Sequence, residues 1–124
     1  MSGKKERVVV LGASPNPERY SNKAVSMLLE HGHEVVPVHP IAEKIENLRV
    51  VAKLHDVTGA VDTLTLYLSG DTLAGLEGAI VNLKPGRVIF NPGTENPVLM
   101  ENLRQSGLNV VQACTLVLLR TGQF

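Results

Sequence analysis

The segment VVVLGASPNPERYSNKA, from Val8 to Ala24, decides the fold of this chain. A run of aliphatic residues stops at Gly12, a stiff segment with two prolines follows, and a helical pattern of apolar residues then begins. Continuous aliphatic runs of this kind are typical of a strand buried on both faces of a parallel sheet. We therefore predict a strand over Arg7–Leu11 and a helix over Ser21–His31, joined by a loop at the carboxyl end of the strand.

The rest of the chain repeats this alternation of strand-like and helix-like segments. Parallel strands separated by helices need crossover connections, which are right-handed and place helices on both faces of the sheet. We therefore predict a single doubly wound α/β domain over residues 1–124, with a mostly parallel sheet of five to six strands. The further strands are expected at Glu34–Val38, Asp62–Leu68, Arg87–Asn91 and Asn109–Gln112, with a short edge strand at Val50-Val51. The further helices are expected at Leu73–Leu83 and from a cap at Asn96 to Gly107, with one helical turn at Lys53–Val57, whereas the form of Cys114–Phe124 stays open.

The composition argues against several classes of function. Lys and Arg number 12 and Asp and Glu number 12, whereas proteins that bind nucleic acid broadly usually carry a basic excess. Aromatic residues make up 3% and Trp is absent, which disfavours stacking platforms for single-stranded nucleic acid. Residues 1–7 are polar, and no apolar run approaches the roughly 18 to 20 residues that span a bilayer, so we expect neither a secretory signal nor a membrane segment. The single cysteine, Cys114, fits a reducing compartment, and we expect a cytoplasmic protein.

The loop after the first strand is the best candidate for a ligand site. In an open parallel sheet, ligands bind outside the carboxyl ends of the strands. Gly12 allows a tight turn there, and the backbone amides at the start of the next helix, together with the helix dipole, favour a phosphate. The groups that can contact such an anion are the amides of Ala13 and Ser14, those near Tyr20–Asn22, the hydroxyls of Ser14 and Ser21, and the Arg19 guanidinium. In the alternative interpretation, Pro15 and Pro17 only stiffen a connection and Ser21 only caps the helix.

This loop does not match the usual nucleotide-binding motifs. A dinucleotide fingerprint reads G-x-G-x-x-G, but the chain reads GASPNP from Gly12 to Pro17. Such a site also requires an acidic residue about 20 residues further on, at the end of the second strand, where this chain has His39-Pro40. The G-K-[ST] of a P-loop is absent from the sequence as well. The sequence therefore argues against an ordinary NAD site.

The remaining reactive side chains give weaker signals. The four histidines lack metal-ligand spacing and a lone cysteine cannot complete a thiolate site, so we predict no metal site. His39 either hydrogen-bonds a ligand or closes the loop. Cys114 follows an apolar strand and is interpreted as a buried, inert thiol, with an oxidisable thiol that faces the groove as the alternative. Glu95 is the only carboxylate expected near the groove, and a role within its own loop is favoured, so no catalytic residue is predicted.

Three stretches together resemble a known family. VVVLGASPNPERYSNKAVSMLLEHGHEVVPVHP, FNPGTEN and VVQAC are similar to the small bacterial and archaeal coenzyme A-binding proteins, free-standing relatives of the CoA-binding domain of the succinyl-CoA synthetase α subunit. The resemblance covers nearly the whole chain and implies a Rossmann-like sheet that holds CoA across its carboxyl edge. The same fold also occurs in repressors that sense NAD(H). The second domain of the synthetase subunit, with its phosphorylated histidine, is missing from this sequence, so the ligase activity is not carried over.

The resemblance also implies which residues would contact CoA. Lys44 would act as partner of the 3′-phosphate in place of a family lysine at the position of Ile41, and Cys114 matches a cysteine often found near the end of the family pattern. The loop residues that would wrap the phosphates are Gly12, Ala13, Ser14, Asn16, Arg19, Tyr20 and Ser21. His39 and Pro40 would lie by the adenosine, and the pantetheine arm would lie against Ser69, Gly70, Asn91, Pro92 and Gly93.

These observations lead to a first hypothesis and two alternatives. The first is a cytoplasmic module that binds CoA or an acyl-CoA, in a non-catalytic or regulatory role. The alternatives are an NAD(H)-binding redox sensor or dehydrogenase fragment, and a ligase or transferase subunit that needs a partner chain. We expect a small-molecule nucleotide ligand, no nucleic acid and no membrane. The apolar stretch Leu116–Leu119 would pack either on the domain or on another copy, which leaves a homo-oligomer or a protein partner open.

Overall fold

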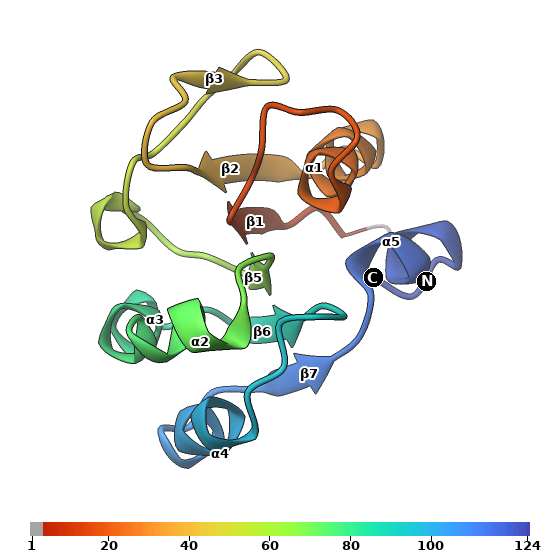
Figure 1. The fold of residues 1–124 in the computed structure, drawn as a ribbon. Coiled ribbons are helices and arrows are strands. Elements are labelled where there is room, and N and C mark those ends of the chain that lie inside the picture. The colour runs from red at the N-terminus through yellow and green to blue at the C-terminus, as the bar shows by residue number, and fades with distance from the viewer. Residues whose placement is uncertain (1–3) are drawn as a thin grey trace.

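The centre of the molecule is a five-stranded sheet in which every neighbouring pair of strands is parallel (Figure 1). The computed structural model describes residues 4–124. The strand order is β2-β1-β5-β6-β7, so the order reverses between β1 and β5. The strands are β1 (Arg7–Leu11), β2 (Glu34–Val38), β5 (Thr63–Leu66), β6 (Arg87–Phe90) and β7 (Val110–Gln112). The predicted Rossmann-like α/β fold with a parallel sheet is confirmed.

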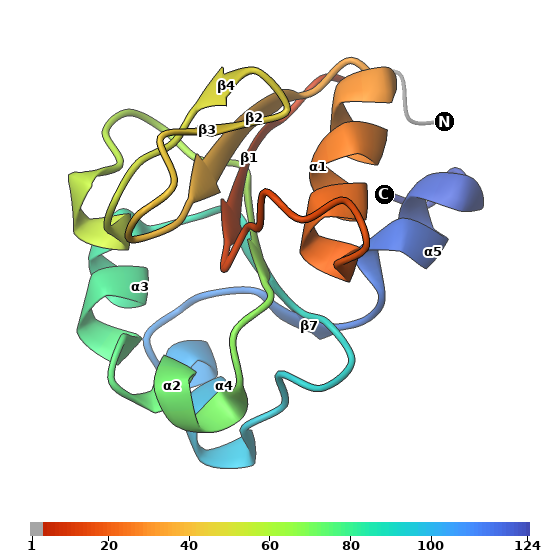
Figure 2. The ribbon, with the colours of Figure 1, turned by 45° about the horizontal axis from the view of Figure 1, so that its top comes forward.

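Helices cover both faces of this sheet (Figures 1 and 2). One face carries α1 (Tyr20–Glu30) and α5 (Thr115–Arg120), and the other carries the short helix η1 (Leu54–Asp56), α2 (Gly70–Ala74), α3 (Glu77–Leu83) and α4 (Pro97–Gln105). The alternation of side chains along β1 produces the two cores. Val8 and Val10 pack with α1 and α5, whereas Val9 and Leu11 pack with the helices of the opposite face. The long aliphatic run is therefore buried on both sides.

The helix predicted over Leu73–Leu83 is wrong in one respect, because the structure has two helices there. α2 ends at Ala74, and the amide of the next residue, Gly75, donates to the Thr72 carbonyl at 3.3 Å in a tight turn. Leu76 then has φ −111° and ψ 9°, outside the helical range, before α3 begins. Glycine is a poor helix former, so the chain breaks where the apolar pattern alone predicts continuity.

The segment after β7 takes a definite form. It folds into α5, and Leu116 and Leu119 are buried at 4% and 3% exposure. The apolar stretch Leu116–Leu119 thus packs mainly on its own domain, although Val117 within it is 48% exposed.

A small hairpin follows β2 and was not predicted. It consists of β3 (Lys44–Ile45) and β4 (Leu48–Arg49), joined by a two-residue turn in which Glu46 and Asn47 both have positive φ. Turns with this conformation suit the right-handed twist of paired strands. The edge strand predicted at Val50-Val51 is reduced to a single parallel bridge between Val51 and Val38. The main sheet therefore has five strands rather than six.

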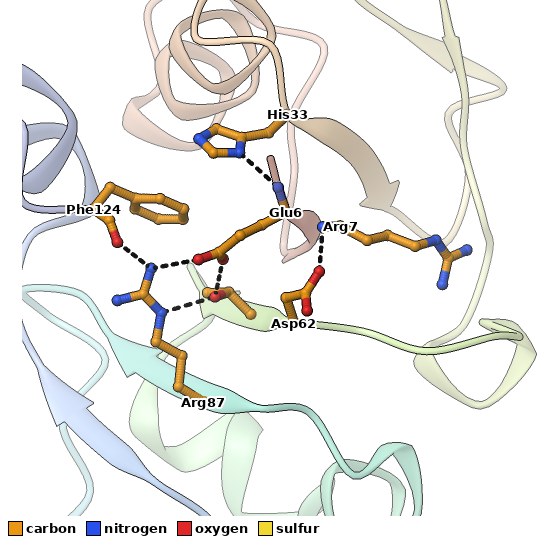
Figure 3. A network of polar contacts seen from close by, with 7 residues as sticks. Glu6, Arg7, His33, Asp62, Arg87 and Phe124 are labelled. Carbon is orange, nitrogen blue, oxygen red and sulfur yellow. Dashed lines mark hydrogen bonds and ion pairs between the residues drawn. The ribbon is translucent and has the colours of Figure 1, made fainter. Parts of the chain in front are cut away.

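A polar network joins the amino ends of the strands, at the edge opposite their carboxyl ends (Figure 3). Thr63 at the start of β5 accepts a hydrogen bond from Arg87 Nε at 2.8 Å and donates one to Glu6 Oε1 at 2.6 Å. Arg87 Nη2 also donates to the Phe124 carbonyl at 2.8 Å and lies 3.6 Å from Glu6 Oε2. The network thus ties Glu6, just before β1, and Phe124, beyond α5, to the strands of the sheet.

Within residues 4–124, no helix combines the length and the hydropathy needed to cross a membrane.

Candidate functional site

A groove of about 520 Å³ lies at the carboxyl ends of the strands, where the strand order reverses. This is the position at which open α/β sheets bind ligands. The groove is lined by Gly12, Ala13, Ser14, Arg19, Tyr20, Ser21, His39, Pro40, Tyr67, Leu68, Ser69, Pro92, Gly93 and Thr94. Among these described residues none is acidic, and Arg19 is the only one with a permanent charge. The groove therefore favours an anionic ligand.

Gly12 shapes the floor of the groove. Its φ is +89°, a conformation that L side chains rarely adopt. A Cβ atom at this position would lie 2.9 Å from Leu68 Cδ2 and 3.0 Å from the Tyr67 carbonyl carbon. The glycine is thus required both by the turn after β1 and by the close approach of the chain after β5.

The loop between β1 and α1 is held by its own polar groups. Asn22 is 2% exposed, and its Nδ2 donates to the Ser14 carbonyl at 2.8 Å. The Asn16 amide donates to Ser14 Oγ at 3.1 Å, and Asn16 Oδ1 accepts from the Glu18 amide at 3.0 Å. Asn16, one of the predicted site residues, does not line the groove and instead fixes the loop. The sequence pattern did not reveal the bond between Asn22 and Ser14.

The start of α1 points its backbone amides out of the helix end. The first intrahelical bond is donated by the Lys23 amide to the Arg19 carbonyl at 3.1 Å. The amides of Tyr20, Ser21 and Asn22 precede it, so they have no partner in the preceding turn of the helix. The interpretation of Ser21 as a helix cap is wrong, because Arg19 is the cap residue and Ser21 lies buried in the first turn. Its position inside the groove fits the ligand-loop interpretation.

His39 both closes a loop and faces the groove. Its Nδ1 accepts hydrogen bonds from the Ile41 amide at 3.0 Å and the Ala42 amide at 2.8 Å. Because Nδ1 accepts, the proton of the neutral ring resides on Nε2. The remaining ring nitrogen is therefore a donor, and His39 and Pro40 form one wall of the groove.

Lys44 lies outside the groove, in an adjoining hollow of about 400 Å³. That hollow shares His39 and Pro40 with the groove and is also lined by Arg49 and by the acidic Glu43. Lys44 and Arg49 are directly opposite in the β3–β4 pair. Like charges in opposite positions repel each other, so a bound anion would relieve the pair. Arg49 was missed in the sequence because the hairpin that places it was not predicted.

Asn91 and Gly70, two further predicted site residues, serve the framework beside the groove. Asn91 is 1% exposed, and its Nδ2 donates to Thr65 Oγ1 at 2.7 Å and to the Leu66 carbonyl at 2.8 Å. Its Oδ1 accepts from the Thr115 amide at 2.8 Å, which ties the start of α5 to β5 and β6. A Cβ atom on Gly70 would lie 2.5 Å from the Glu95 carbonyl oxygen, so the glycine lets α2 pack against that loop.

Glu95 has the role within its loop that we expected from the sequence. Its Oε1 accepts a hydrogen bond from the Gly93 amide at 2.9 Å. Gly93 has φ +92° and lines the groove, as does Thr94, whose Oγ1 donates to the Asn91 carbonyl at 2.7 Å. Pro92 and Gly93 thus lie at the groove as predicted.

A second chamber of about 360 Å³ opens beside the groove. It is lined by Tyr20, Tyr67, Asn91, Pro92, Cys114, Leu116 and Arg120, and it shares Tyr20, Tyr67 and Pro92 with the groove. Cys114 is half-buried in its wall, so the interpretation of this residue as a fully buried thiol is wrong. Burial, with Cys114 nearby, raises the pKa of Tyr67 well above its ordinary value, so this hydroxyl is neutral.

Comparison with known proteins identifies the family. A family model described as a CoA binding domain matches residues 6–120. The protein YneT of Bacillus subtilis is 22% identical over 106 residues, which cover 86% of this chain and 78% of YneT. A crystal structure of an uncharacterized protein shares 39% sequence identity at a TM-score of 0.92 and covers 98% of this chain and 99% of its own.

The fold also occurs in a larger enzyme. The dinucleotide-forming acetyl-coenzyme A synthetase 1 of Ca. Korarchaeum cryptofilum has a TM-score of 0.75 and 22% identity. The match covers 87% of this chain but 25% of the synthetase, and at this identity the likeness concerns the fold alone. The family match spans nearly the whole described domain, so the chain belongs to the CoA-binding domain family.

Proposed function

We propose that this protein binds coenzyme A across the carboxyl edge of its sheet and has no catalysis of its own. The observation that carries the proposal is the start of α1, where three outward-pointing amides and Arg19 meet a groove without acidic lining residues. This arrangement suits a diphosphate, because amides at a helix start and a guanidinium both stabilise phosphate oxygens. The family to which the chain belongs supports CoA as the source of that diphosphate.

In this proposal the adenosine end lies beside His39 and Pro40. The Nε2–H group of His39 is free to donate to it, since Nδ1 is already engaged by two backbone amides. The 3′-phosphate then lies by Lys44, in the hollow that adjoins the groove. Arg49, opposite Lys44, supplies a second cation for the same phosphate.

The pantetheine arm extends in the other direction, past Ser69 toward Pro92 and Gly93. These residues line the groove from the ends of β5 and β6. The opposite ends of CoA thus occupy opposite ends of the groove, with the diphosphate between them at the loop after β1. Asn91 and Gly70 support this wall from behind rather than contact the pantetheine arm.

A nicotinamide nucleotide is the natural competitor for such a groove. NAD sites use an acidic residue at the end of the second strand to bind the ribose hydroxyls, and His39 occupies that place here. We therefore expect CoA to bind more tightly than NADH.

The test is a calorimetric titration together with a thermal-shift series, each with CoA, dephospho-CoA and NADH. A ligand that binds only the folded state at a hundredfold excess over its Kd stabilises that state by roughly 2.7 kcal/mol. We expect a clear shift with CoA, a smaller one with dephospho-CoA and the smallest with NADH. No shift with millimolar CoA would refute the proposal, and a larger shift with NADH would replace it with a nicotinamide site.

A further inference from the structure

We propose that the second chamber holds the acyl group of a coenzyme A thioester, so that the preferred ligand is an acyl-CoA rather than free CoA. The inference rests on the proposed function, because it requires the pantetheine arm to lie in the groove. Beyond that function, the inference assigns a class of ligand, the acyl-CoA thioesters, and a location for their acyl chain.

The chamber is positioned to receive that chain. Tyr20, Tyr67 and Pro92 line both the groove and the chamber, so the two spaces adjoin at the end of the groove assigned to the pantetheine arm. The acyl group of a thioester is attached at the last atom of that arm. A chain that leaves the sulfur past Pro92 therefore enters the space between β6 and α5.

The wall of the chamber is suited to an apolar occupant. It presents the rings of Tyr20, Tyr67 and Pro92, the thiol of Cys114 and the side chain of Leu116. The amide of Asn91 also borders it, but both ends of that amide are already bonded to Thr65, Leu66 and Thr115. The Tyr67 hydroxyl is buried beside Thr65 and Thr115 and stays neutral, so it adds no charge to the wall. Only the exposed Arg120 carries a charge.

The size of the chamber also favours a ligand that carries an acyl group, rather than a free thiol, at the end of the pantetheine arm. Its volume of about 360 Å³ equals the space of roughly a dozen water molecules in the liquid. Water in an apolar space lacks hydrogen-bond partners, and an alkyl chain that displaces it gains affinity. Free CoA would leave this space hydrated, whereas a short acyl chain would fill it.

The test is a titration of the wild-type protein with CoA, acetyl-CoA, butyryl-CoA and hexanoyl-CoA. We expect butyryl-CoA to bind about tenfold more tightly than acetyl-CoA, from the burial of two further methylene groups. Equal affinities for all the thioesters would overturn the inference and leave the proposed function standing. If CoA and every thioester fail to bind, the proposed function is wrong and the inference fails with it.

A substitution at Cys114 locates the effect in the chamber. Cys114 precedes α5 but its side chain makes no capping hydrogen bond, so its replacement removes no such bond. Cys114→Phe fills the chamber and is expected to abolish the gain in affinity from acetyl-CoA to butyryl-CoA. If the phenylalanine ring unfolds the domain, the smaller substitution Cys114→Leu serves as the second variant. The matched control is Val117→Phe, on the exposed side of the same helix, which should leave the gain unchanged. A gain that persists in folded Cys114 variants would place the acyl chain elsewhere and refute the inference.

Discussion

The side-chain amide of Asn22 donates a hydrogen bond of 2.8 Å to the carbonyl oxygen of Ser14, and this contact joins the first turn of α1 to the loop before it. The donor is 2% exposed, so water cannot readily replace the bond. The loop is therefore shaped before any ligand arrives, which lowers the entropic cost of ordering it on binding.

Asn22→Asp tests this bond with almost no change of volume. The new carboxylate cannot donate, repels the Ser14 carbonyl and opposes a phosphate at the same helix end. We expect the free energy of unfolding to fall by about 1–3 kcal/mol and the affinity for CoA to fall as well. Urea denaturation and calorimetry measure the two effects. Glu30→Gln, at the exposed far end of the same helix, is the control, and identical unfolding midpoints for Asn22→Asp and wild type would show that the bond is unimportant.

The turn after β1 can be tested with a matched pair of glycines. Gly12→Ala places a Cβ atom 2.9 Å from Leu68 Cδ2 at a φ of +89°, and we expect a loss of about 1–3 kcal/mol in stability. Gly78→Ala places its Cβ atom in open space within α3, and we expect a gain of about 0.5 kcal/mol. Thermal unfolding of both variants gives the comparison. Shifts of the same sign would contradict the assigned role of Gly12.

Substitution of Arg19 tests ligand binding independently of the stability of the fold. Its side chain is exposed and lines the groove, so Arg19→Ala should change the free energy of unfolding by less than about 0.5 kcal/mol. If the guanidinium pairs with the diphosphate, CoA should bind about tenfold more weakly. Arg104→Ala, an exposed arginine on α4, controls for the loss of one positive charge. Equal affinity of Arg19→Ala and wild type for CoA would remove Arg19 from the site.

The stability of the protein should depend on pH through His33. Burial lowers the pKa of His33 below its ordinary 6.5, opposed by Glu6 and assisted by the nearby positive charges of Lys5, His31 and Arg87. The Nδ1 atom of His33 also accepts a hydrogen bond from the Glu6 amide at 3.0 Å, which requires that nitrogen to be unprotonated (Figure 3). Folding thus favours the neutral ring.

The direction of the pH effect follows from proton binding. Below pH 6.5 the unfolded chain binds a proton that the folded protein rejects, so the contribution is complete above about pH 6.5 and is lost as the pH falls through the folded pKa. Denaturation at about pH 7.5 and pH 5.5 should show lower stability at the acidic value. His33→Gln cannot titrate and should flatten this part of the profile, and an unchanged slope in that variant would assign the effect to another group.

The sequence was most informative where a single local rule decides the structure. The aliphatic run before Gly12 and the cap at Asn96 each act within a few residues, and each prediction is confirmed. The groove follows from the same logic, because the carboxyl ends of parallel strands must meet at one edge.

The features that were missed depend on contacts between distant residues or on unusual backbone. The turn of the β3–β4 hairpin uses Glu46 and Asn47 at positive φ instead of a glycine, so no turn motif marks it in the sequence. In the sequence Asn91 resembles a ligand-binding residue, but its side-chain amide is already hydrogen-bonded to Thr65, Leu66 and Thr115. The exposure of Cys114 depends on how α5 returns to the α1 face, which no local pattern of residues specifies.

The C-terminal helix α5 is clamped at two opposite edges of the sheet. At its start the Thr115 amide is held by Asn91 beside the groove, and beyond its end the Phe124 carbonyl is held by Arg87 in the network at the far edge (Figure 3). Both ends of α5 are therefore fixed to the sheet, and the width of the second chamber depends on the positions of these two hydrogen bonds. Arg87 and Phe124 lie at the edge of the sheet opposite the proposed site, so if an acyl chain occupies the chamber, substitutions at that distant edge would change the length of the chain that fits.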